Sequence, residues 1–128
     1  MKAVLMSIKP EWWEKILSGK KTLEIRKTAP MAFLHQTRVE NKPFEVYTYV
    51  SGTGLVKGHF LCPGWLNMNN MRAISPQSCV PEADLHRYAG SKGEVVAWRV
   101  KNPESFLPLP LSTFGVKKAP ISWQYITV

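Results

Sequence analysis

The chain has 128 residues, of which 45% are hydrophobic and 20% charged, and it carries a net charge of +8. This composition is typical of a globular protein with a single hydrophobic core, and it excludes a disordered chain. No apolar stretch approaches the roughly 20 residues that a membrane helix needs. We therefore expect one domain, residues 1–128, located in the cytoplasm and without membrane contact.

The N-terminal residues are predicted to form a strand and then a helix. Residues 3–8 read as a strand that ends before Pro10, a residue that suits the first turn of a helix. Gly19 is placed to end that helix in the left-handed conformation. By the spacing of its apolar residues, the buried face of the helix is predicted to hold Trp13, Ile16 and Leu17.

The segment after Gly19 has the period of a strand with one apolar and one charged face. The polar residues Thr22, Glu24 and Arg26 alternate with the apolar residues Leu23 and Ile25. Glu24 and Arg26 then lie about 7 Å apart on one face, close enough for an ion pair, and Lys21 can reach toward them from the preceding turn. The sequence therefore predicts a cluster of charged side chains at this strand.

The rest of the chain is predicted to form further strands and one more helix. We first expect a hairpin of residues 44–50 and 55–61, and then a long loop or short-helix insertion over 63–81. A short helix over 81–90 and a strand over 94–101 follow. An extended connector through Pro103, Pro108 and Pro110 then leads to a last strand over 122–127. This pattern predicts an α+β fold, a mixed sheet of five or six strands with two or more helices that curls toward a small barrel.

Two segments, Ser7–Trp13 and Ile16–Lys27, strongly resemble the opening of ASCH-domain proteins, which belong to the PUA-like superfamily. Their pattern is a lysine-proline turn, a helix that ends in Gly, and Lys-Thr-x-Glu-x-Arg on a strand. The resemblance continues in residues 43–60, which are similar to the central hairpin of the family, and in residues 109–112 and 119–125, which are similar to the ending of its short bacterial and phage forms.

The resemblance implies a PUA-like pseudobarrel whose cleft lies beside the first helix and the Lys-Thr-x-Glu-x-Arg strand, and it implies binding to RNA or action on RNA. The positive charge fits a polyanionic ligand, with DNA or a nucleotide-like ligand as alternatives to RNA. The expected nucleic-acid-binding residues are Lys9, Trp12, Lys20, Lys21, Glu24, Arg26, Lys27, Tyr49, Ser122 and Trp123. Within this set the Lys and Arg side chains are expected to neutralise phosphates, Glu24 to orient these cations, and Trp12 or Trp123 to stack on a base.

A binding domain is the leading hypothesis, and a hydrolase is the alternative. One PUA-like branch consists of small amidohydrolases that remove acyl groups from N4-acylated cytidine by means of a Lys and a Thr on this strand and a distant Glu. Lys21 matches the lysine, whereas Glu24 occupies the position of the threonine, which argues against the same mechanism. A ribonuclease is the other enzymatic option, with Lys21, Tyr49 and Ser122 as candidates. If the protein is an enzyme, Lys21 and Glu24 are the expected catalytic residues.

No cofactor or metal is expected. His59 and Cys62 supply two ligands where a structural zinc site needs four, and the other His and Cys residues fit no standard spacing. Cys62 and Cys79 are expected to be reduced thiols. A third option is an interaction module for another protein, with a patch in the 63–81 segment formed by Trp65, Leu66, Met68 and Met71.

Overall fold

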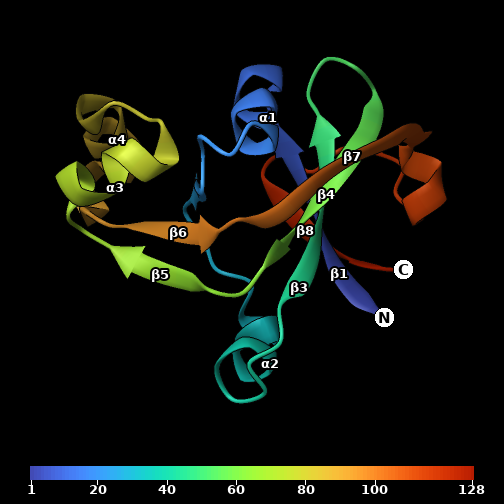
Figure 1. Cartoon of the computed structure of the whole chain (residues 1–128), viewed down its shortest axis with the longest axis horizontal. Helices are drawn as coiled ribbons and strands as arrows, with labels where there is room; N and C mark the ends of the chain where they lie inside the picture. Colours follow the sequence, from blue (N-terminus) through green and yellow to red (C-terminus); the bar gives the residue numbers. More distant parts are fainter.

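The computed structural model describes all of residues 1–128 as an α+β fold built on two sheets (Figure 1). The strands are β1 (Lys2–Ile8), β2 (Leu23–Arg26), β3 (Phe44–Val50), β4 (Leu55–Cys62), β5 (Trp65–Met68), β6 (Val95–Arg99), β7 (Lys101–Pro110) and β8 (Trp123–Thr127). The α-helices are α1 (Pro10–Leu17), α2 (Leu34–Arg38), α3 (Met71–Ser78) and α4 (Glu82–Ala89). The predicted fold class is confirmed, with eight strands in place of five or six.

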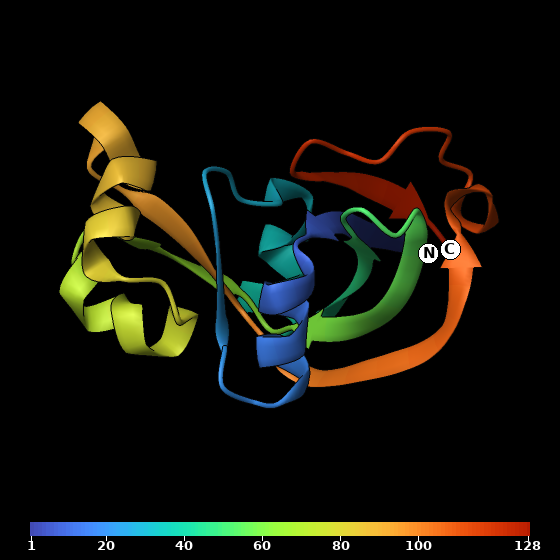
Figure 2. The same ribbon diagram turned by 90° about the horizontal axis from the view of Figure 1, so that it is seen from above.

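The larger sheet has the strand order β7-β4-β3-β1-β8, and the smaller one has the order β2-β6-β5. β1 runs parallel to β3, with Val4 opposite Val46, and every other pairing is antiparallel. Seen from above, the larger sheet is strongly curved, while the smaller sheet extends away from it to carry α3 and α4 at its far end (Figure 2). α1 lies between these two parts, and it therefore borders both.

Three clusters of buried apolar side chains hold these layers together. The largest contains Trp13, Phe60 and Trp98, which lie between α1 and the two sheets. A second cluster joins α3 and α4 to the smaller sheet. The third covers the opposite face of the larger sheet, where Tyr49 packs at its margin. Trp13 is thus interior, as the sequence predicts, and Trp98 is fully buried beside it.

α1 packs closely on the larger sheet at Gly58 of β4. A Cβ atom at this position would overlap both the Trp13 ring and the carbonyl oxygen of Glu104 on β7. Glycine is required here because the helix, the strand and its neighbour approach one another with no room for a side chain. This contact fixes the distance between α1 and the sheet, and with it the position of Trp12, which directly precedes Trp13 in the helix.

The prediction of an extended connector through the three prolines was wrong, because residues 101–110 form β7. This strand pairs with β4 alone and lies at the edge of the sheet, where a proline without an N–H group costs no ladder hydrogen bond on its open side. The β4–β7 register also shifts at two places, between Val56 and Gly58 and between His59 and Leu61. Edge position and bulges together explain how the prolines fit.

Four smaller corrections concern short elements and individual side chains. Residues 63–81 contain the predicted short helix but also β5, a four-residue strand whose only pairing is with β6, far along the chain. Residues 31–38 form a 3-10 turn and α2, which the sequence analysis did not predict. Leu17 is exposed and does not belong to the buried face of α1. Of the proposed patch for a protein partner, Trp65 and Met71 are buried in the core.

Candidate ligand pocket

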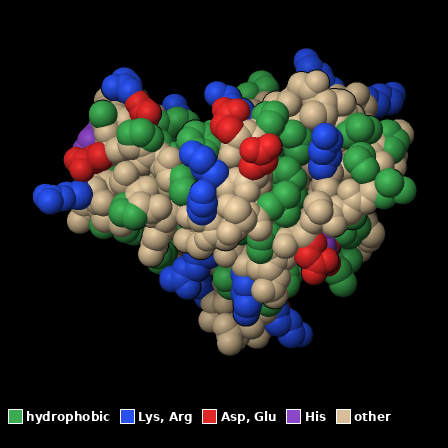
Figure 3. Space-filling model, turned by 45° about the horizontal axis from the view of Figure 1, so that its top comes forward, with side chains coloured by type: hydrophobic (Ala, Val, Ile, Leu, Met, Phe, Trp, Pro, Cys, Tyr) green, Lys and Arg blue, Asp and Glu red, His purple; other side chains and the backbone are tan.

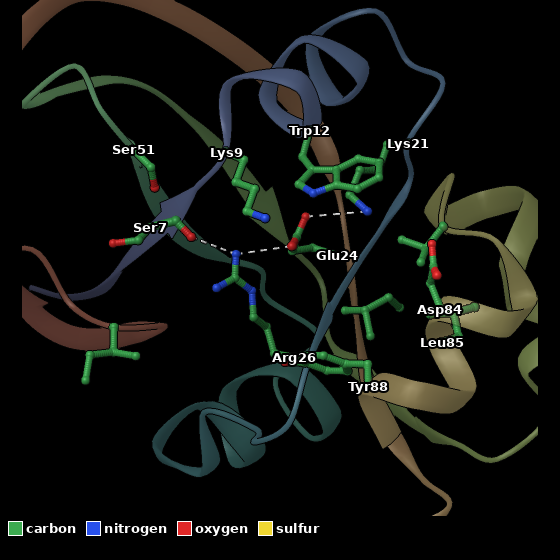
Figure 4. Close-up of a pocket in the computed structure, with 13 residues that line it drawn as sticks. Ser7, Lys9, Trp12, Lys21, Glu24, Arg26, Ser51, Asp84, Leu85 and Tyr88 are labelled. Carbon is green, nitrogen blue, oxygen red and sulfur yellow. Dashed lines mark hydrogen bonds and ion pairs between the residues drawn. The ribbon is translucent and has the colours of Figure 1, made fainter. Parts of the chain in front are cut away.

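A pocket of about 450 Å³ opens where α1, β2 and α4 meet (Figure 4). Ser7 at the end of β1 and Lys9 and Trp12 at the start of α1 form one side. β2 and the residues before it form the floor, and α4 forms the opposite wall. The lining residues are Ser7, Lys9, Trp12, Lys21, Glu24, Ile25, Arg26, Ser51, Val80, Asp84, Leu85, Tyr88 and Ile121.

Lys21 is buried on the floor of this pocket and is only 2% exposed. The chain turns at Gly19, which has a φ of 81°, and then leads through the exposed Lys20 to Lys21, just before β2. The Lys21 ammonium donates to the carbonyl oxygen of Ser78, lies 4.9 Å from the centroid of the Trp12 ring, and lies 3.7 Å from Oε2 of Glu24. Burial lowers the pKa of Lys21, and the Glu24 carboxylate offsets part of this effect.

Glu24 lies between two cations and is 5% exposed. Its Oε1 accepts a hydrogen bond of 3.1 Å from Nη2 of Arg26, which confirms the predicted ion pair on β2. Its Oε2 accepts no hydrogen bond from the protein. The charged face of β2 is therefore an interior face, in contrast to an ordinary solvated strand face.

Arg26 is tied to the protein through both terminal nitrogens of its guanidinium group. Nη2 donates to the carbonyl oxygen of Ser7 at 2.8 Å as well as to Glu24. Nη1 donates to the carbonyl oxygen and to the hydroxyl of Ser122, both at 3.2 Å. The remaining nitrogen, Nε, has no hydrogen-bond acceptor in the protein. Arg26 thus joins β2 to the end of β1 and to the start of β8, and few of its donors remain for a ligand.

The wall opposite α1 is formed by α4. The Tyr88 ring borders the pocket, the Lys27 ammonium lies 5.1 Å from its centroid, and burial raises the pKa of its hydroxyl. Asp84 also borders the pocket and forms an ion pair with Arg87 of the same helix, so its negative charge is compensated. Trp12 faces this wall from α1 and is half-buried. The pocket therefore has an aromatic ring on each side and a positively charged floor.

The structure brings together five of the ten predicted binding residues as pocket lining, namely Lys9, Trp12, Lys21, Glu24 and Arg26. Ser122 contacts Arg26 from outside the lining, and Lys27 contacts Tyr88. Lys20 is exposed outside the pocket.

Trp123 and Tyr49 lie elsewhere. The Trp123 indole donates to the hydroxyl of Thr28 at 2.9 Å and its ring packs on Trp98. Tyr49 belongs to the margin of the cluster on the other face of the sheet.

The contribution of α4 to the pocket is not evident from the sequence. The helix itself is predicted, but no local pattern indicates that Asp84, Leu85 and Tyr88 face residues 21–26 across the fold. Their proximity comes from the pairing of β2 with β6, which brings the two parts of the chain together. No group of three or more His, Cys, Asp or Glu side chains lies close enough to hold a metal ion. None of the helices is long and apolar enough to cross a membrane.

The fold consists of a curved mixed sheet and a second, small sheet that carries two helices. The basic pocket lies between these two parts. The crystal structure of the ASCH protein from Zymomonas mobilis is similar to this chain, with a TM-score of 0.78 and 17% identity over 98% of this chain and 87% of that one. A serine-to-alanine variant of that protein matches with a TM-score of 0.77 and 16% identity, over 98% and 88% of the two chains. A tyrosine-to-phenylalanine variant of the same protein matches with a TM-score of 0.77 and 16% identity, over 99% of this chain and 91% of that one.

The chain therefore has the ASCH fold, and the resemblance in its sequence is confirmed at the level of the fold. No family model and no curated protein matches the sequence.

Proposed function

We propose that this protein, acting as one domain over residues 1–128, binds RNA by taking an unpaired nucleotide into the pocket between α1 and α4. The observation that carries this proposal is the pocket itself, whose volume of about 450 Å³ and half-buried Trp12 ring suit a single base and sugar. Ligand pockets range from about 300 to 1,000 Å³ and combine aromatic walls with a few placed polar groups. Stacking on such a ring contributes about 1–3 kcal/mol per base.

The charges around the pocket favour a polyanion. Lys9, Lys21 and Arg26 face Glu24 and Asp84, and Asp84 is already paired with Arg87. Lys20 and Lys27 are exposed on the segment that leads from α1 through β2. On the face that Figure 3 presents, the Lys and Arg side chains are spread singly and form no continuous patch. We therefore expect a short contact with few phosphates, and affinity that depends on the pocket as well as on charge.

The salt dependence of RNA binding tests this proposal. If about four phosphates are neutralised on a single strand, the logarithm of the binding constant should fall with the logarithm of salt concentration at a slope near −3. Titration of short single-stranded RNA, followed by tryptophan fluorescence over a salt series, measures this slope. Trp12→Leu should weaken binding, whereas Trp123→Leu, outside the pocket, serves as the matched control. Binding that does not change with salt would contradict a phosphate contact.

A second candidate is a hydrolase that acts on RNA or on an acylated cytidine, and the state of Lys21 favours it. A buried amine with a lowered pKa is partly neutral at a lower pH than a free lysine, and a neutral amine can take a proton from water or from a hydroxyl. Glu24 lies beside it and can pass that proton on. In this candidate water adds to the acyl carbonyl group, and the products are cytidine and a carboxylic acid.

The pH profile of product formation separates this candidate from simple binding. Because the pKa of Lys21 lies below its ordinary value of 10.5, the neutral amine becomes populated as the pH rises through that lowered value, and the rate should rise and then level off. Lys21→Met should abolish the reaction, and Lys20→Met, a neighbouring exposed lysine, should not. Intact RNA and intact N4-acetylcytidine at every pH, detected by chromatography, would exclude the hydrolase.

A further inference from the structure

We propose that Lys21 and Glu24 together bind a ribose hydroxyl, so that the pocket selects ribonucleotides over deoxyribonucleotides. This inference rests on the proposed function and specifies which chemical group of the nucleotide reaches the floor of the pocket. It is carried by two neighbouring polar groups on that floor, one acceptor and one donor, whose hydrogen-bonding capacity the protein leaves unfilled.

The acceptor is Oε2 of Glu24. The carboxylate is 5% exposed, and its other oxygen already accepts from Arg26. A buried carboxylate oxygen without a hydrogen-bond donor is unfavourable, because burial removes its contact with water and no hydrogen bond from the protein replaces it. A ligand that donates to Oε2 therefore gains a hydrogen bond to a charged group and removes that penalty.

The donor is the ammonium group of Lys21, which has three N–H bonds. One of them points to the carbonyl oxygen of Ser78, and the Trp12 ring lies 4.9 Å away on another side. The distance of 3.7 Å between Nζ and Oε2 of Glu24 is too long for a direct hydrogen bond. It is short enough for one oxygen atom to lie about 2.8 Å from both.

A group at that point must accept from Lys21 and donate to Glu24 through the same atom. A hydroxyl group does both. A phosphate oxygen and a base carbonyl accept but do not donate, and an exocyclic amino group of a base donates but is a poor acceptor. A ribose hydroxyl is therefore the part of a nucleotide that satisfies both residues, and the 2′-hydroxyl is the one that RNA has and DNA lacks.

Access to the pair lies past Lys9. Figure 4 shows the Lys9 side chain pointing toward the Glu24 carboxylate from the open side of the pocket. Lys9 is exposed, so its long side chain can move aside without loss of packing. Its ammonium group then becomes free for the phosphate next to the bound sugar, while the Trp12 ring remains beside the base. In this arrangement the base of one nucleotide lies beside the Trp12 ring, its ribose hydroxyl binds Lys21 and Glu24, and its phosphate binds Lys9.

The test compares single-stranded oligonucleotides of one sequence that carry a 2′-hydroxyl, 2′-hydrogen or 2′-O-methyl group, together with a free ribonucleoside and its 2′-deoxy form. Because a hydrogen bond to a charged group contributes more than an ordinary one, the wild-type protein should bind the 2′-hydroxyl oligonucleotide about tenfold or more tightly than the other two. Glu24→Gln should reduce the RNA affinity to near the DNA level and change the DNA affinity little. Glu14→Gln, which removes the same charge from an exposed site on α1, should preserve the preference.

The outcomes separate this inference from the proposed function. Equal, salt-dependent affinity of the wild-type protein for the three oligonucleotides overturns the hydroxyl site and leaves nucleic-acid binding in place. Binding of the free ribonucleoside over its 2′-deoxy form, with no oligonucleotide bound, supports the hydroxyl site and overturns the proposal of polymer binding. Since the comparison among oligonucleotides uses the wild-type protein, it remains decisive even if Glu24→Gln does not fold.

Discussion

Replacement of Arg26 by alanine is expected to lower the free energy of unfolding by about 3–5 kcal/mol, the usual cost of removing one partner from a buried ion pair. The change leaves Glu24 buried with Lys21 as its remaining ion-pair partner, at a distance too long for a hydrogen bond. It also removes the donors to the carbonyl oxygens of Ser7 and Ser122, which join β2 to β1 and β8. Urea unfolding measures the loss.

The control for this prediction is Arg99→Ala, which removes an exposed arginine from the neighbouring strand β6. Its effect should stay within about 0.5 kcal/mol, as for most surface substitutions. The double variant Arg26→Ala with Glu24→Ala should be less destabilised than the sum of the two single variants, because the two side chains depend on each other. Additive effects, or an Arg26→Ala protein as stable as the wild type, would show that the ion pair contributes little.

This expectation differs from the one that the sequence supports. The resemblance of the Lys-Thr-x-Glu-x-Arg strand makes Arg26 a cation that neutralises a phosphate of the ligand. The pattern correctly predicts that Glu24 and Arg26 pair, because neighbours on one face of a strand depend only on local geometry. It cannot show that Ser7 and Ser122 accept from the same guanidinium group, since those contacts span 19 and 96 residues of the chain.

The same distinction explains what else the sequence could and could not predict. The first strand, the first helix and the β3–β4 hairpin have local signals, namely a proline, glycines and an apolar period, and they were predicted within a few residues. β5 and β7 depend on partners elsewhere in the chain, so their sequences alone read as a loop and a connector. In the pocket, Lys9, Trp12 and Lys21 follow from the motif, whereas Tyr88 reaches it only through the pairing of β2 with β6.

Replacement of Gly58 by alanine should be among the most destabilising single-methyl additions in the chain. The new Cβ would overlap the Glu104 carbonyl oxygen on one side and the Trp13 ring on the other, so either the β4–β7 pair must separate or α1 must move outward. Added volume in a packed core commonly costs about 1–3 kcal/mol, and a loss at the upper end of this range or beyond is expected because one of the two obstacles is backbone. Trp13→Leu in the same chain should recover only part of the loss, since the backbone contact remains.

This substitution also tests whether the position of α1 controls the pocket. Trp12 and Lys9 belong to α1 and to the turn that precedes it, so an outward movement of the helix would carry both away from Lys21 and Glu24. We therefore expect Gly58→Ala, at a temperature where it is still folded, to lose RNA affinity and to shift the tryptophan emission of the free protein. A folded Gly58→Ala protein that binds RNA as the wild type does would show that the pocket tolerates displacement of α1, and it would argue against a nucleotide held between Trp12 and the floor of β2.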